Sequence, residues 1–108
     1  MSSNAIDSAT GLPEIIRERI CSHLHSDPRI TSVVLFGSRA KGTWREGSDI
    51  DVAVFGSGLD RTDVWTWNNE LDADVFPWSL DIVIVDERTD RQLREHISRV
   101  GWPLCGRV

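Results

Sequence analysis

Three aspartates interrupt stretches that are otherwise apolar, and they are the residues of this sequence best suited to chemistry. Asp49 and Asp51 open the stretch DIDVAVFG, and Asp81 lies within SLDIVIVD. A buried carboxylate is costly unless it is paired, and three carboxylates that converge need a cation to stay ionised together. Carboxylate oxygens suit Mg²⁺, with Mn²⁺ as an alternative, and two such ions would clamp the attacking and leaving oxygens of a phosphoryl transfer. If the two strands are neighbours, the three aspartates are therefore catalytic and metal-binding residues.

A Gly-Ser turn precedes the first two aspartates and has the features of a phosphate site. Gly37 lets the backbone approach a ligand closely, and the N–H groups that begin a short helix attract anions. The hydroxyl of Ser38 adds a hydrogen bond, and Arg39 and Lys41 add positive charge. These four residues are predicted to bind a nucleotide, although a solvated loop accounts for Arg39 and Lys41 about equally well.

Periodicity predicts the elements that position these groups. In the second of three strands, a period of two places Asp49 and Asp51 on one face. The first helix carries an apolar stripe and ends where Pro28 disfavours helical geometry. The expected order is a helix from Pro13, a strand over 30–37, a short helix or turn from Ser38, a strand over 49–56, a helix over 60–72, a strand over 79–86 and a helix from about Asp90 to Gly101.

Composition limits the class of protein. The 108 residues are 40% apolar and 27% charged, which is typical of one soluble domain. We expect residues 1–11 to be disordered and 12–108 to form the domain. The net charge of −5 argues against direct nucleic-acid binding, and no apolar run is long enough to span a membrane. Cys21 and Cys105 match no metal-binding spacing, so reduced thiols of a cytoplasmic protein are expected.

Tryptophan is frequent, with five residues in the chain. Trp67 fits the apolar stripe of the 60–72 helix. Trp44, Trp65 and Trp78 are candidate contacts for a partner protein, because exposed tryptophans often anchor interfaces. At least two of these three are expected to be buried or half-buried instead.

The spacing Gly37-Ser38, ten residues, then Asp49-x-Asp51 resembles the signature of the polymerase-β-like nucleotidyltransferase superfamily. Within it, the short chain resembles the minimal nucleotidyltransferases of the MNT antitoxin type, over about residues 33–85. The resemblance implies an α+β palm, a small mixed sheet of at least three strands flanked by helices. It also implies that Gly37 and Ser38 hold a triphosphate, that Asp49 and Asp51 hold metal ions, and that Asp81 helps bind metal and activates the attacking hydroxyl.

The same resemblance implies a function. Such proteins often pair with a HEPN-domain ribonuclease toxin and neutralise it by transferring AMP from ATP to a tyrosine of the toxin. This chain contains no tyrosine and no added acceptor-binding domain, so the expected acceptor is a hydroxyl on a partner protein. The expected enzyme is a protein adenylyltransferase that uses ATP or another NTP. The alternatives are an antitoxin that masks its partner without catalysis, and nucleotidyl transfer to a small molecule or an RNA end.

Overall fold

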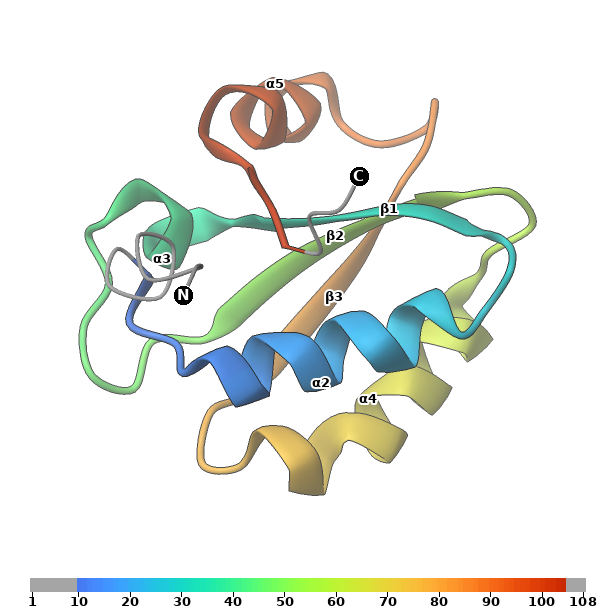
Figure 1. The fold of residues 1–108 in the computed structure, drawn as a ribbon. Helices are drawn as coiled ribbons and strands as arrows, with labels where there is room; N and C mark the ends of the chain where they lie inside the picture. Colours follow the sequence, from blue (N-terminus) through green and yellow to red (C-terminus); the bar gives the residue numbers. More distant parts are fainter. Residues whose placement is uncertain (1–9, 105–108) are drawn as a thin grey trace.

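A mixed four-stranded sheet separates two helical layers in the computed structural model, which describes residues 10–104 (Figure 1). The strand order is β3-β2-β1-β4, with β1 antiparallel to both β2 and β4 and with β3 parallel to β2. The elements are α2 (Glu14–His25), β1 (Ile30–Phe36), α3 (Gly37–Lys41), β2 (Ile50–Gly56), α4 (Arg61–Val75), β3 (Leu80–Val85), α5 (Arg91–Val100) and β4 (Trp102–Pro103). The predicted α+β fold class is confirmed.

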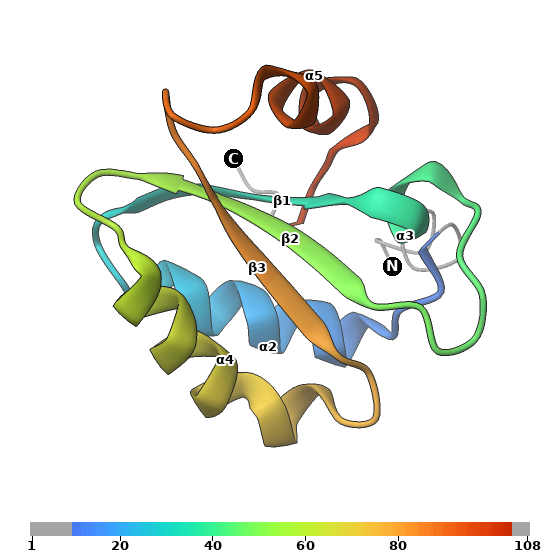
Figure 2. The same cartoon turned by 180° about the vertical axis from the view of Figure 1, so that it is seen from behind.

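Helices cover the two faces of the sheet unequally. Figures 1 and 2 show α2 and α4 side by side beneath one face, α5 across the other, and α3 at the end of β1. Along β2, Ile50, Val52 and Val54 are completely buried in the main core with α2 and α4. Ala53 points the other way, into a smaller cluster with Ile97 of α5. The two faces of β2 therefore belong to two separate apolar clusters.

The apolar stripes of the helices form the main core as the sequence predicts. Buried side chains recur along α2 and along α4 at helical spacing. Asp60 caps α4 with a capping box to Asp63, and the helix runs on to Val75, three residues past the predicted end. It stops where Phe76 precedes Pro77, a position that disfavours helical geometry. The stripe residues are Ile16, Ile20 and Leu24 of α2 and Trp67, Leu71 and Val75 of α4.

The end of the described chain contains a strand that the sequence did not predict. Gly101 ends α5 as expected, and β4 follows immediately with only two residues, too few for a periodic pattern. Trp102 pairs with Leu35 of β1, and its indole Nε1 donates to the carbonyl of Ala40 at 2.9 Å. Trp102 thus holds this end of the chain against both β1 and α3.

Of the three candidate partner-contact tryptophans, only Trp65 is exposed, with 67% of its surface accessible. Trp44 and Trp78 are half-buried, and Trp78 packs against the main core. This confirms that at least two of the three are buried or half-buried, and it leaves Trp65 as the candidate contact.

Two further predictions concern the cysteines and the first residues of the chain. Cys21 is disulfide-bonded, so the prediction of reduced thiols is wrong at this residue, because distance along the sequence sets no limit on proximity in a folded chain. Cys105 lies outside the described residues. The cytoplasmic location was predicted from reduced thiols. It stays a prediction, and the disulfide at Cys21 does not support it. Residues 1–9 also lie outside the described residues. Thr10, the first described residue, is buried. No helix within 10–104 is long and apolar enough to cross a membrane.

Candidate active site

The register of the central strands brings two of the predicted carboxylates together. Asp51 of β2 lies directly beside Asp81 of the parallel strand β3. Neighbouring strands are about 4.8 Å apart, and residues paired in this way project from the same face. That face is the one covered by α5, because Ile50 and Val52 on either side of Asp51 point to the opposite core. Asp49, two residues earlier and exposed, stands just ahead of β2.

The charges of the three aspartates interact. Burial, first, and then the nearby charges of Asp81 and Asp49 together raise the pKa of the Asp51 carboxyl to about 6. Asp51 is half-buried, whereas Asp49 and Asp81 are exposed. Asp81 and Asp49 are thus near enough to Asp51 to disfavour its charged form, while the binding of a metal ion by all three stays a prediction. A cation placed between them would favour the charged form.

Gly37 lies against the carboxylate of Asp51, in a backbone conformation that suits glycine. Its φ is +75°, a conformation that favours glycine. A Cβ built on Gly37 would overlap Oδ2 of Asp51, because the register pairs Phe36 with Asp51 and so sets the next residue against the carboxylate. The Gly-Ser turn and the first carboxylate strand are therefore in direct contact, and only glycine meets both requirements.

Ser38 is half-buried and lies at the start of α3. Phe36, the residue that caps this short helix, makes no side-chain hydrogen bond to it. The carbonyl of Ser38 accepts from the backbone N–H groups of Gly42 and Thr43, each at 3.0 Å, which closes the turn. Its hydroxyl has no hydrogen-bond partner within residues 10–104. The hydroxyl and the first N–H groups of α3 are thus the polar groups beside Asp51.

Arg39 is the one predicted phosphate-binding residue that the structure buries, with 1% of its surface exposed. Its guanidinium donates to the carbonyl of Thr10 at 2.7 Å and to the carbonyl of Ser48 at 3.1 and 3.3 Å. The ring of Trp44 lies 5.1 Å away in a cation–π contact. Burial lowers the pKa of Arg39. This geometry favours a role in holding the loop that ends at Asp49.

Lys41 is placed differently from Arg39. It lies at the end of α3, is exposed, and forms no ion pair or hydrogen bond with the rest of residues 10–104. Of the two cations predicted to contact phosphate, Lys41 is therefore the one whose charge is available to a ligand.

The arrangement fits a cation that completes its shell with substrate. Within residues 10–104, no group of three His, Cys, Asp or Glu side chains is already arranged to hold a metal ion. Mg²⁺ does not need such a cage, since it keeps several waters and binds through one or two carboxylates plus the phosphates of a substrate. The oxygen donors Asp49, Asp51 and Asp81 suit this ion by type and by charge.

Three contacts of Arg39 were missed by sequence reasoning. Thr10 and Ser48 bind Arg39 through their backbone carbonyls, which every residue carries, so no residue type signals them. Trp44, one of the three candidate partner contacts, is half-buried and contacts the Arg39 guanidinium, a contact that the sequence did not predict. An aromatic residue a few positions after a buried arginine is the one signal that was available.

The fold and the site together define a nucleotidyltransferase, and comparison with known proteins agrees. The family described as polymerase beta nucleotidyltransferase matches residues 18–107, so the chain belongs to this family. No curated protein sequence matches the chain.

Solved structures place the chain near minimal nucleotidyltransferases and antitoxins. A toxin–antitoxin structure with AMP-PNP is 29% identical with a TM-score of 0.69, over 84% of this chain and 73% of that chain. A candidate minimal nucleotidyltransferase is 31% identical with a TM-score of 0.60, over 81% and 87%. The complex of a tri-AMPylated Shewanella oneidensis HEPN toxin with an MNT antitoxin is 25% identical with a TM-score of 0.62, over 87% and 72%.

Proposed function

We propose that this chain is a metal-dependent nucleotidyltransferase that transfers AMP from ATP to a hydroxyl of a partner protein. The observation that carries the proposal is the Asp51–Asp81 pair, with Asp49 close enough to affect the same carboxyl and Gly37 in contact with it. The related structures that contain AMP-PNP and an AMPylated HEPN toxin support ATP as the donor and a HEPN toxin as the partner. The chain would then act as the antitoxin of the pair.

Each residue has a role in this proposal. Asp49, Asp51 and Asp81 would hold Mg²⁺, which supplies positive charge to the triphosphate. The N–H groups that follow Gly37 and the free hydroxyl of Ser38 would steady the leaving phosphates. These groups act by positioning and by neutralising charge, which phosphoryl transfer generally requires.

The proposed reaction is an in-line displacement at the α-phosphorus of ATP. The acceptor oxygen forms a bond to this phosphorus, the bond to the bridging oxygen breaks, and pyrophosphate leaves. The hydroxyl proton passes to a carboxylate, for which we assign Asp81, because its side chain is exposed at the surface where an acceptor would arrive. Arg39 takes no direct part and holds the loop before Asp49.

Intact mass spectrometry tests the proposal. A HEPN protein encoded beside this gene is incubated with ATP, Mg²⁺ and a substoichiometric amount of the chain. We expect the mass of AMP to be added to the partner. The reaction is run in parallel with an Asp49→Asn, Asp51→Asn variant, which should add none, and with Asp72→Asn, an exposed aspartate of α4, which should behave as the parent.

Other outcomes point elsewhere. A partner that stays unmodified but forms a stable complex would overturn the proposal in favour of an antitoxin that masks its partner. Nucleotide found on an added small molecule or RNA end, with the partner unmodified, would keep the transferase and overturn the protein acceptor.

A further inference from the structure

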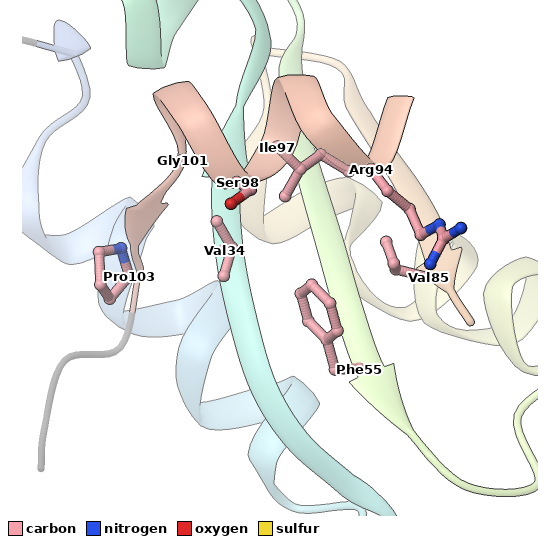
Figure 3. Close-up of a pocket in the computed structure, with 8 residues that line it drawn as sticks. All are labelled: Val34, Phe55, Val85, Arg94, Ile97, Ser98, Gly101 and Pro103. Carbon is pink, nitrogen blue, oxygen red and sulfur yellow. The ribbon is translucent and has the colours of Figure 1, made fainter. Parts of the chain in front are cut away.

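A pocket of about 360 Å³ opens between α5 and the sheet, and the proposed function does not use it (Figure 3). Its floor is apolar and comes from three strands, and its roof is one face of α5. Pockets for small molecules are typically of this kind, mostly apolar with a few polar groups at fixed places. The residues used below are Val34, Phe55 and Val85 of the floor and Arg94, Ile97 and Ser98 of α5.

This pocket is separate from the carboxylates. Phe55 and Asp51 lie on the same face of β2, four residues and therefore about 13 Å apart. Between them Ala53 is completely buried in a cluster with Ile97 of α5. The helix therefore crosses the strand between the two places, and a small ligand in the pocket would not contact the aspartates.

Two polar side chains flank the apolar floor. Arg94, Ile97 and Ser98 are spaced to share one face of α5. Figure 3 shows the guanidinium of Arg94 over Val85, and the hydroxyl of Ser98 near Val34 on the other side. Arg94 is exposed and its guanidinium forms no ion pair or hydrogen bond with residues 10–104, whereas the guanidinium of Arg91 in the same helix pairs with Glu95 at 3.6 Å. The pocket thus has an uncompensated positive charge at one end.

We propose that this pocket binds a small aromatic carboxylate. The carboxylate would accept the paired N–H donors of Arg94, the geometry that guanidinium favours. The ring would lie between Ile97 and the ring of Phe55, where an offset or edge contact is favourable. A hydroxyl at the far end of the ligand would hydrogen-bond to Ser98.

The structure favours a small molecule over a polypeptide. The floor is the face of a sheet, and the hydrogen-bonding groups of strand backbones lie in the plane of the sheet, so even those of the edge strand β3 do not point into the pocket. The roof is a helix, whose backbone groups are bonded along its own axis. Peptide recognition generally relies on free main-chain groups at a strand edge or on a nest of backbone N–H groups. Recognition here depends on side chains alone.

Binding of 3-(4-hydroxyphenyl)propionate tests the proposal, observed by titration of the methyl NMR signals of Val34, Val85 and Ile97. For a ligand of this size we expect a Kd of about 0.1–2 mM. Arg94→Gln should weaken binding about tenfold, the effect of losing a charged hydrogen bond. Arg99→Gln, an exposed arginine of α5 that does not line the pocket, should leave the Kd unchanged within about twofold.

Three results would overturn the proposal. The first is the absence of methyl shifts at saturating acid. The second is equal binding of the uncharged 3-(4-hydroxyphenyl)propanamide, or an equal loss in the Arg99→Gln variant, since either would remove the role of Arg94. The third is tighter binding of an acetylated peptide that ends in tyrosine, which would make the ligand a protein C-terminus.

Discussion

On the α2/α4 side of the sheet, β2 presents Val52 and Val54, both completely buried, whereas on the α5 side the same strand presents Asp51 and Phe55, both partly exposed. Among the described helices, α2 and α4 cover the first face and α5 lies across the second. The first face is an ordinary close-packed core. The second leaves a carboxylate site on one side of α5 and a pocket on the other, so stability and chemistry are divided between the two faces.

The largest expected effect is the loss of catalysis on the α5 face. Asp51→Asn keeps the shape of the side chain and removes its charge, so we expect transfer to fall by at least about 10³-fold, equivalent to about 4 kcal/mol of transition-state stabilisation. The rate is measured as nucleotide added to the partner per unit of folded protein. If the variant retained a tenth of the parent activity, Asp51 would not be a metal-binding residue.

The matching change on the other face should affect stability alone. Leu71 of α4 is completely buried in the main core, so Leu71→Ala should lower the free energy of unfolding by about 3 kcal/mol. Urea denaturation measures this loss. Transfer by the remaining folded protein should stay within about twofold of the parent, and a large fall in that rate would break the division between the two faces.

Substitution of Arg39 tests whether this residue supports the stability of the fold or binds the nucleotide. Arg39→Met fills similar space but removes the guanidinium donors to the carbonyls of Thr10 and Ser48, so we expect a loss of about 2 kcal/mol in the free energy of unfolding. Lys41→Met is the control from the same helix, and its stability should be unchanged because Lys41 is exposed. Its KM for ATP should rise a few-fold, about 1 kcal/mol, if the lysine contacts phosphate. If Arg39→Met instead raised the KM for ATP and kept its stability, while Lys41→Met lost stability, Arg39 would be a nucleotide-binding residue.

The smallest expected effect is on the stability of the metal-free chain. The pKa of Asp51 is about 6 in the folded state, above the ordinary value of 3.8, so folding favours the protonated carboxyl. The stability from this group is present below pH 4 and is lost as pH rises through about 6. Asp51→Asn should therefore match the parent near pH 4 and exceed it near pH 8, by about 1–2 kcal/mol after allowance for partial exposure.

Thermal unfolding in EDTA at the two pH values measures this difference. The lowered pKa of Asp27 and Asp63, which comes first from their hydrogen bonds with Arg29, also makes stability depend on pH, but it affects both proteins alike and cancels. A variant less stable than the parent near pH 8 would mean that Asp51 supports the fold.

The sequence predicts much of the candidate site because the proposed pattern is carried by side chains at fixed spacing. The spacing of Asp49 and Asp51, at the start of a predicted strand, places them near each other, and the stripe of Ile16, Ile20 and Leu24 identifies the face of α2 that is buried. The adjacency of Asp81 required the strand order, which no local pattern specifies. The neighbours of Arg39 are mostly backbone carbonyls, and the disulfide at Cys21 depends on tertiary proximity, so neither has a local sequence signal.

The strand order also bears on whether copies of this chain can associate through the edges of the sheet. One edge of the described sheet is β4, which is two residues long and contains Pro103, and both features discourage a further strand from adding there. The other edge is β3, whose six residues are apolar except for Asp81. Asp81, the aspartate assigned to catalysis, is thus also the only charged residue within β3, and a charge on an edge strand disfavours pairing with another strand. Replacing Asp81 with an apolar residue is therefore expected to promote self-association at high concentration.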